Sequence, residues 1–140
     1  MHKRDYLVKQ IEEFAKVMSI LLGLKRDENY PKLSELISES LKKYTSIEID
    51  YIESLIDEQL IDILTSEKKL NDEQLKILAD LLFEKADYYF NSQQNSELKL
   101  KGINCYKKSY VIYLFLKEQT TLTYSLDMHY KLELLSKMKL

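Results

Sequence analysis

The residues best able to do chemistry in this sequence are two histidines, one cysteine and several closely spaced carboxylates. A ferritin-like di-metal site needs two Glu-x-x-His pairs, and neither His2 nor His129 has a glutamate three positions earlier. A structural zinc site needs four nitrogen or sulfur ligands, which these residues cannot supply. No Gly-x-Gly or Gly-Lys-Ser/Thr sequence is present that would form a phosphate-binding loop. The sequence therefore predicts neither a metal nor a cofactor.

Cys105 and His129 form one candidate nucleophile and base, because they lie on helices that are expected to be neighbours. Cys105 also falls on an apolar stripe, and free cysteine is among the residue types most often buried. We favour an inert buried thiol. Asp80, Glu84 and Asp87 share one helical face at i, i+4 and i+7. We interpret them as a solvated acidic surface, with a catalytic pair as the alternative, and predict that the protein is not an enzyme.

Eleven tyrosines occur without any tryptophan, and Tyr106, Tyr110 and Tyr113 follow one another along one predicted helix beside Lys107 and Lys108. Three interpretations are open. The rings pack in a core with their hydroxyls near water, they form a protein-binding face, or they stack on nucleic-acid bases while lysines meet phosphates. The sequence pI of about 5.8 disfavours the third, because nucleic-acid-binding domains are usually basic. The candidate interaction surface consists of Tyr106, Tyr110, Tyr113, Tyr124, Met128 and Leu135.

The composition indicates a single all-α domain over residues 1–140. Only two glycines and one proline occur, whereas an all-β domain needs turn residues at short, regular intervals. No apolar run is long enough for a transmembrane helix, and the N-terminus lacks the pattern of a signal peptide. One cysteine cannot form an intrachain disulfide, as is typical of a reducing compartment. A cytoplasmic location is expected, with no contact to a membrane.

The net charge of −2 conceals an uneven distribution along the chain. Residues 1–47 carry a net charge of +2, residues 48–97 carry −9, and residues 98–140 carry +5. The interpretation we favour is intramolecular, with the acidic middle lying beside the basic C-terminal part. The alternatives are a site for an acidic partner at the C-terminal end and charge-guided head-to-tail self-association.

A first helical hairpin is predicted over residues 5–44. Its first helix, residues 5–22, places one apolar stripe on one face, and Gly23 is expected to provide a left-handed cap. Pro31 suits the first turn of the second helix, where its missing N–H group is not needed. The two stripes contain Leu7, Ile11, Phe14, Ala15, Met18, Leu21 and Leu22, and then Leu33, Leu36, Ile37, Ser40, Leu41 and Tyr44.

Short helices are predicted over residues 50–66, with Asp50 and Asp57 as N-terminal caps. A second hairpin over residues 71–118 begins with Asn71 capped reciprocally by Gln74, and residues 91–96 form its loop. The run Val111–Leu116 has no polar face and is expected to be central in the core or half-covered by another subunit. A last helix is predicted over residues 122–139, with apolar residues on two sides.

The two hairpins resemble tetratricopeptide-repeat units. In the second hairpin, Leu82, Ala86 and Tyr89 match the large, small and aromatic positions of the first repeat helix, and Cys105 matches a small position of the second. Lys85 departs from the pattern at a usually apolar position, and so does Gly102 at a usually aromatic one. The resemblance implies a compact array of antiparallel helical hairpins that acts through its surface.

Nearly the whole chain also resembles a family of small, uncharacterised bacterial all-helical proteins that is filed as a domain of unknown function. The residues that carry this likeness are Arg4–Glu12, Leu21–Leu24, Asn29-Tyr30 and the short-helix segment Asp50–Leu64. The likeness implies an all-helical fold related to tetratricopeptide repeats, and it implies no activity.

These observations predict a non-enzymatic protein-interaction or scaffold module that self-associates. The apolar surplus of the helices at residues 97–118 and 122–139 predicts a homodimer through them, since a two-fold interface is the commonest oligomer symmetry. The identity of any other protein partner stays open. The alternative function is nucleic-acid binding or regulation through the basic, tyrosine-rich C-terminal third.

Overall fold

The computed structural model describes residues 3–92, 95–119 and 126–138, and every regular element among them is helical. The predicted all-α class is confirmed. The α-helices are α1 (Lys3–Arg26), α2 (Tyr30–Thr45), α3 (Ile49–Ser54), α4 (Asp57–Asp62), α5 (Asp72–Ser92), α6 (Ser96–Glu118) and α7 (Leu126–Lys137), and a π-helical turn, η1 (Ile63–Glu67), follows α4.

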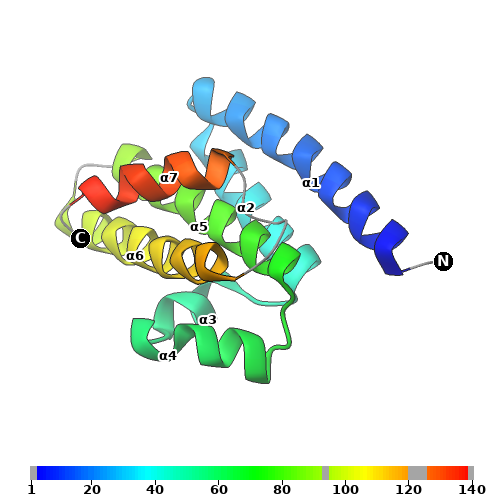
Figure 1. The fold of residues 1–140 in the computed structure, drawn as a ribbon. Coiled ribbons are helices and arrows are strands. Elements are labelled where there is room, and N and C mark those ends of the chain that lie inside the picture. Colours follow the sequence, from blue (N-terminus) through cyan, green and yellow to red (C-terminus); the bar gives the residue numbers. More distant parts are fainter. Residues whose placement is uncertain (1–2, 93–94, 120–125, 139–140) are drawn as a thin grey trace.

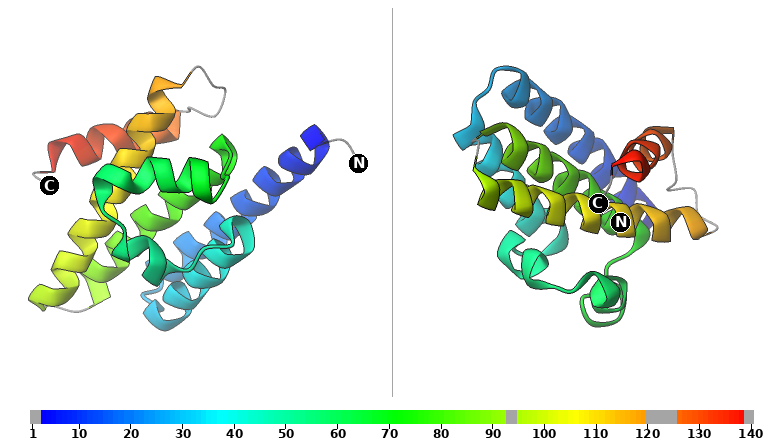
Figure 2. Two further views of the ribbon diagram at one scale, coloured as in Figure 1. Left: turned by 90° about the horizontal axis from the view of Figure 1, so that it is seen from below. Right: turned by 90° about the vertical axis from the view of Figure 1, so that its left-hand side faces the viewer.

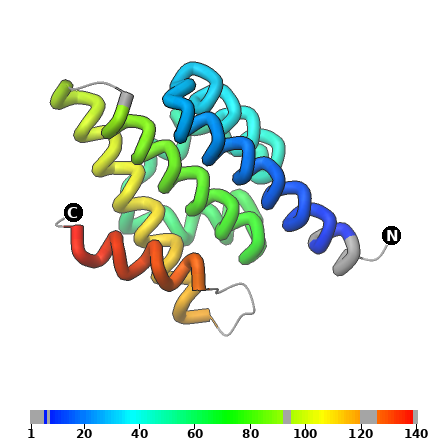
Figure 3. Tube along the Cα trace, turned by 90° about the horizontal axis from the view of Figure 1, so that it is seen from above, coloured from blue at the N-terminus to red at the C-terminus, as the bar shows by residue number. Residues whose placement is uncertain are grey.

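An antiparallel pair, α5 and α6, lies at the centre of the molecule (Figure 1). The hairpin of α1 and α2 packs on α5, while α7 crosses above α6 and the short helices α3 and α4 lie below it. The right-hand view of Figure 2 shows the pair between α1 at the top and α3 and α4 at the bottom. Seen from above, α1 and α7 lie on either side of α5 (Figure 3).

The most buried helix is α5. All ten residues from 77 to 86 are buried, whereas Val111, Leu114 and Phe115 of α6 are only partly buried. Of the two alternatives predicted for the run Val111–Leu116, the central place in the core belongs instead to α5, and coverage by another subunit stays a prediction. Neighbouring helices cover α5 on both its faces, because α2, α6 and α1 all pack on it.

The end of α1 differs from the prediction. Gly23 does not adopt a positive φ, and the helix continues to Arg26. Glu28, with φ of 56°, provides the left-handed residue instead. The Asn29 N–H group donates to the Leu24 carbonyl at 2.9 Å and the Glu28 N–H group to the Lys25 carbonyl at 3.1 Å, the two bonds of a Schellman motif. The extra turn lets Leu24 pack against the core.

The start of α5 was predicted correctly. The Gln74 N–H group donates to Asn71 Oδ1 at 2.8 Å, and the Asn71 N–H group donates to Gln74 Oε1 at 3.0 Å, as in a capping box. Gln74 Nε2 also donates to the Tyr44 carbonyl at 3.1 Å, which joins α5 to the end of α2. Pro31 lies in the first turn of α2, as expected.

The caps predicted for the short helices are wrong. α3 begins at Ile49, one residue before Asp50, and the residue that precedes it makes no side-chain cap. Asp57 is the first residue of α4 and its carboxylate accepts a hydrogen bond from Lys108 instead. The helix predicted over residues 122–139 is α7, and Leu122 and the Leu7 side chain lie outside the described part of the chain.

Alanine substitutions at the two glycines should have opposite effects on the free energy of unfolding. A methyl group at Gly23 meets only Arg26 Nη2, at 3.9 Å, whereas at Gly102 it would lie 2.7 Å from Phe90 Cε2 and 3.3 Å from the Ala86 carbonyl oxygen. We expect Gly23→Ala to raise the free energy of unfolding by about 0.5–1 kcal/mol through helix propensity. Gly102→Ala should lower it by about 1–3 kcal/mol through overpacking.

Urea denaturation of the two variants and the wild type measures both effects. Equal stabilisation by the two substitutions would contradict the close approach of α5 and α6 at Gly102.

Candidate functional site

Four of the six residues of the predicted interaction surface lie in the core. Tyr106, Tyr113, Met128 and Leu135 are buried within the protomer, so the prediction is wrong for these four. Tyr110 is partly buried, and Tyr124 lies outside the described residues. The core-packing interpretation is the correct one for Tyr106 and Tyr113, because their rings are buried and their hydroxyl groups donate to carboxylates of α5.

Those carboxylates belong to Asp80, Glu84 and Asp87, which we call the carboxylate cluster. The prediction that they form a solvated face is wrong for Asp80 and Glu84, which are 3% and 4% exposed. Asp80 accepts a hydrogen bond from the Tyr113 hydroxyl. It also pairs with Lys76 Nζ at 2.7 Å and with Lys131 Nζ of α7 at 3.4 Å.

The other two members of the cluster connect α5 to α1 and α6. Lys25 Nζ of α1 lies 3.3 Å from Glu84 Oε2 and also pairs with Asp87. Asp87 accepts a further hydrogen bond from the Tyr106 hydroxyl of α6. Burial raises the pKa of Glu84, and the nearby Lys25 only partly offsets this. Burial, followed by the Asp80 carboxylate, raises the pKa of Tyr113 well above its ordinary value.

The ion pairs and hydrogen bonds of the carboxylate cluster join α5 to α1, α6 and α7. General acid–base catalysis requires a carboxyl group within hydrogen-bonding reach of a substrate, whereas Asp80 and Glu84 are enclosed and already paired with lysine and tyrosine side chains. Burial lowers the pKa of Lys131, but the carboxylates of Asp80 and Asp127 outweigh it and leave that pKa raised. The lysine therefore stays charged where it contacts α5.

A second polar cluster holds the short helices against α6. Tyr89 donates to Glu53 Oε1 at 2.6 Å, and Asn104 Nδ2 donates to the Glu53 carbonyl at 3.2 Å. Lys108 Nζ, almost fully buried, donates to Asp57 Oδ1 and to Asn104 Oδ1, each at 2.8 Å. These hydrogen bonds add directional contacts to the apolar packing of Ile52 and Leu60, which are fully buried in the core.

Cys105 lies beside this second cluster, with its Sγ atom 3.9 Å from Glu53 Oε1. Burial, reinforced by the Glu53 carboxylate, raises the pKa of the thiol to about 12. A thiol with so high a pKa carries almost no thiolate at neutral pH. His129, which lies on α7, pairs with Glu133 at 3.2 Å. The structure therefore supports the inert-thiol interpretation of Cys105.

Lys85 is a buried cation that the sequence pattern placed at a usually apolar position. Its Nζ atom donates to Ser34 Oγ of α2 at 2.9 Å and lies 4.8 Å from the ring centre of Tyr88 and 5.2 Å from that of Tyr89. Burial lowers the pKa of Lys85. The two rings and the hydroxyl replace part of the lost hydration, so Lys85 fills its apolar position as a packed side chain.

The uneven charge along the chain is partly balanced inside the protomer. Lys108 and Lys131, from the basic C-terminal third, pair with Asp57 and Asp80, from the acidic middle. These two buried lysines are therefore not available on the surface to attract an acidic partner.

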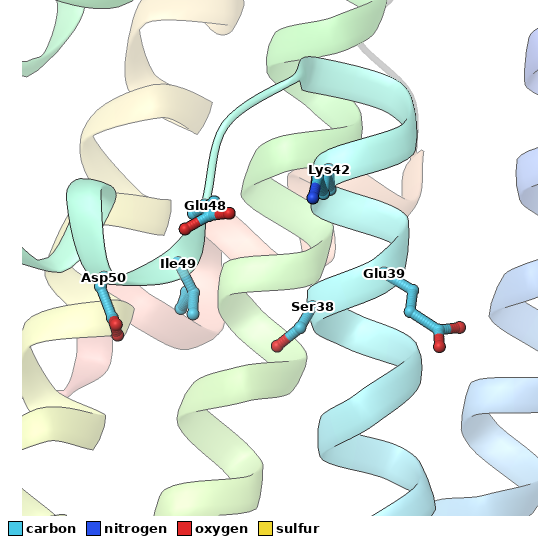
Figure 4. Close-up of a pocket in the computed structure, with 6 residues that line it drawn as sticks. All are labelled: Ser38, Glu39, Lys42, Glu48, Ile49 and Asp50. Carbon is cyan, nitrogen blue, oxygen red and sulfur yellow. The ribbon is translucent and has the colours of Figure 1, made fainter.

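Two shallow grooves lie outside the carboxylate cluster. One, of about 310 Å³, lies between α2 and α3 and is lined by Ser38, Glu39, Lys42, Glu48, Ile49 and Asp50. In Figure 4 the Ser38 and Ile49 side chains face the space between these helices, while Glu39 points away from it. The other, of about 300 Å³, is lined by Asp57, Lys107, Tyr110, Val111, Leu135, Ser136 and Met138. It brings together Tyr110 and Leu135 from the predicted surface.

An exposed apolar stripe on α1 is the feature that sequence reasoning missed. Phe14 and Leu21 face the core, but Val8, Ile11 and Leu22 are 47%, 50% and 50% exposed. The sequence analysis assigned Ile11 and Leu22 to the same face as Phe14. The signal for a second face was the spacing of Val8, Ile11, Ala15, Met18 and Leu22, which we call the α1 stripe.

No known protein family matches the sequence, and no curated protein or solved structure is significantly similar to it. Among the described residues, no group of three or more histidine, cysteine, aspartate or glutamate side chains is arranged to hold a metal ion. No helix in the described part of the chain is long and apolar enough to cross a membrane. The likeness to tetratricopeptide repeats and to the bacterial helical family stays a prediction.

The carboxylate cluster generates a stability prediction. Asp80→Asn keeps the shape of the side chain but removes the charge that partners Lys76 and Lys131. Breaking a buried ion pair is strongly destabilising, so we expect the free energy of unfolding to fall by about 2–4 kcal/mol. Glu133→Gln is the matched control, since Glu133 is exposed and pairs with its own-helix neighbour His129.

The control should change stability by less than about 0.5 kcal/mol. Equal effects of the two substitutions in chemical denaturation would show that Asp80 is solvated after all.

Proposed function

We propose that this protein is a non-enzymatic interaction module that forms a homodimer through the α1 stripe. The observation that carries the proposal is the exposure of Val8, Ile11 and Leu22 along one line of an outer helix. Exposed apolar residues that are scattered singly need no explanation, whereas a contiguous apolar stripe marks an interaction site. α1 is the outermost helix on its side of the fold (Figure 3).

The spacing within the α1 stripe suits another helix. Val8, Ile11, Ala15, Met18 and Leu22 are separated alternately by three and four residues, the spacing of a coiled-coil seam. The stripe is also complementary to itself. An antiparallel pair with its two-fold axis between Ala15 and Met18 sets Ile11 opposite Leu22 of the second copy, and Ala15 opposite Met18. The small Ala15 then faces the larger Met18, and the pairs of Ile11 and Leu22 on either side bring two large apolar side chains together.

The length of α1 favours the same arrangement. α1 has 24 residues and α2 has 16, so α1 is longer by about 12 Å at 1.5 Å per residue. Its N-terminal part projects beyond the rest of the fold (Figure 1). Intrachain packing therefore cannot cover the start of the stripe, and a second copy can.

The proposed interface is small, which sets its expected strength. A single helix face of about two heptads buries less than the roughly 1,600 Å² of a standard interface. We therefore expect a dissociation constant in the micromolar range, near about 10 μM. The dimer would dissociate readily, as befits a module that exchanges partners.

The interface expected from the sequence was on the helices that are now α6 and α7. Four of its residues lie in the core. The exposed large apolar residues of α7 are Leu126 and Tyr130, at 87% and 65%. They lie one turn apart and do not extend into a longer seam. They therefore support the proposal less than the α1 stripe does.

The hairpin arrangement supports a relationship to tetratricopeptide repeats as part of this proposal. α1–α2 and α5–α6 are antiparallel hairpins, and the second helix of the first packs on the first helix of the second. Ala86, which matches the small position of the first repeat helix, lies at the close approach of α5 and α6, opposite Gly102. A cytoplasmic location belongs to the same proposal and fits the single buried Cys105.

The alternative function, nucleic-acid binding, loses three of its expected groups, Tyr106, Tyr113 and Lys108, to the core. Tyr106 and Tyr113 are buried and hydrogen-bonded to α5 carboxylates, so they cannot stack on bases. Lys108 is buried and paired with Asp57, while Lys99 and Lys101 stay exposed. No observation favours this function over self-association.

Sedimentation velocity over a range of protein concentrations tests the proposed dimer. We expect the weight-average mass to rise from 16.7 kDa towards twice that value around the dissociation constant. The double variant Ile11→Glu, Leu22→Glu should stay monomeric, because each copy would bury carboxylates in an apolar seam. Both side chains are exposed, so the variant should fold.

Tyr130→Glu is the control, since Tyr130 is more exposed than either stripe residue but lies on α7. Dimerisation that survives the α1 substitutions and is lost in the control would place the interface on α7. A wild type that stays at 16.7 kDa at the highest concentration would remove the dimer.

A further inference from the structure

A third groove, of about 280 Å³, lies between the N-terminal half of α1 and the end of α2. It lies on the side of α1 away from the α1 stripe, because the α1 residues that line it fall on the far side of the helical wheel from the stripe positions. Its volume is at the lower end for ligand sites. The residues that line it are Tyr6, Lys9, Gln10, Glu13, Lys43 and Tyr44.

Tyr44 gives this groove an unusual polar group. The residue is 3% exposed, and its ring packs edge-on against Phe14 with 5.4 Å between ring centres. Among the described residues, its hydroxyl is the one buried side-chain oxygen or nitrogen without a hydrogen-bond partner. Leaving a buried hydroxyl unpaired costs free energy. Most buried polar groups in proteins are paired, so this exception needs an explanation.

The charges around the hydroxyl favour an anion. Lys9 and Lys43 both line the groove, and Lys43 Nζ lies 5.5 Å from the Tyr44 ring centre. The one carboxylate, Glu13, pairs with Lys43 at the rim. After burial, the Glu13 carboxylate is the next cause of the raised pKa of Tyr44. The Tyr44 hydroxyl and the Glu13 carboxylate are nevertheless not placed in the geometry of a hydrogen bond.

The rim pair can open for a ligand. The Lys43 and Glu13 side chains are 61% and 47% exposed, and ion pairs between exposed side chains contribute little stability. Displacing Glu13 from Lys43 would leave two ammonium groups and one phenol as hydrogen-bond donors around one small space. Tyr6 adds an exposed aromatic ring at the same place.

We propose that this groove binds a small carboxylate with an apolar body. The carboxylate accepts hydrogen bonds from the Tyr44 hydroxyl and from Lys43 or Lys9, while the apolar body packs on the Tyr6 ring. Charge-assisted hydrogen bonds of this kind are the stronger ones in proteins. The proposal is independent of the dimer, because it uses the other side of α1.

Stability in the absence of any ligand provides the first test. If the Tyr44 hydroxyl is unpaired, Tyr44→Phe removes an unsatisfied buried group and should raise the midpoint of thermal unfolding. A lower midpoint than the wild type would show that the hydroxyl is already paired, and would overturn the proposal. Tyr89→Phe is the opposite control, because the Tyr89 hydroxyl donates to Glu53, and its midpoint should fall.

Binding provides the second test, with sodium benzoate as the probe and amide chemical shifts of the full chain as the readout. We expect saturable shifts confined to the groove residues, at millimolar benzoate as befits so small a ligand. In Tyr44→Phe the affinity should fall about tenfold, the loss expected for one hydrogen bond to a charged group. Tyr51→Phe, which changes a tyrosine on α3, should bind as the wild type does.

Inorganic phosphate is the second arm of the titration, because it carries charge without an apolar body. Weaker binding of phosphate than of benzoate supports the proposal. Equal binding of the two anions would reduce the groove to a general cationic patch and overturn it. The absence of saturable shifts with benzoate, or equal affinity in the wild type and Tyr44→Phe, would overturn it as well.

Discussion

The burial of charged residues in the middle of α5 is the constraint on which the rest of the structure depends. A buried carboxylate without a partner costs several kcal/mol, so Asp80 and Glu84 require groups from other helices. Lys25 of α1, Tyr113 of α6 and Lys131 of α7 supply them. Three helices are thereby fixed to α5 by directional bonds, and the apolar residues around these bonds provide the area that drives burial.

The same constraint explains why α1 has an uncovered face. Lys25, Leu21 and Phe14 hold α1 to the body of the fold, and these contacts use one side of the helix and mostly its C-terminal half. The adjoining side carries Val8, Ile11 and Leu22, which stay about half exposed. The self-association that we propose therefore begins where the intrachain network ends.

Sequence patterns predicted the elements whose causes are local. The capping box at Asn71, the position of Pro31 and the apolar stripe of α2 depend on residues within one or two turns, and the structure confirms them. The face of a helix that becomes buried depends on what packs against it. Asp80 and Glu84 lie at the spacing of a solvated stripe. Besides Lys76 on the same helix, the groups that compensate their burial are Tyr113, Lys131 and Lys25, which come from distant segments.

One signal within the sequence could have corrected the picture. Between residues 77 and 86, seven of the ten residues are apolar and occupy every side of the helix, so α5 had no truly polar face. The orphan hydroxyl of Tyr44 could not have been predicted, because it depends on where α1 lies over α2. The same holds for the division of the α1 residues between two faces, since their periodicity alone describes one broad stripe.

Native-state hydrogen exchange tests most directly the claim that α5 organises the fold. Amides in the most protected segment of a domain exchange only through global unfolding. With Asp80 and Glu84 paired to three other helices, the amides of residues 78–84 should be the slowest in the molecule, with an opening free energy equal to that of global unfolding. The amides at the start of α1 should exchange far faster. Opening of residues 78–84 at a lower free energy than the amides of α2 or α6 would contradict the central place given to α5.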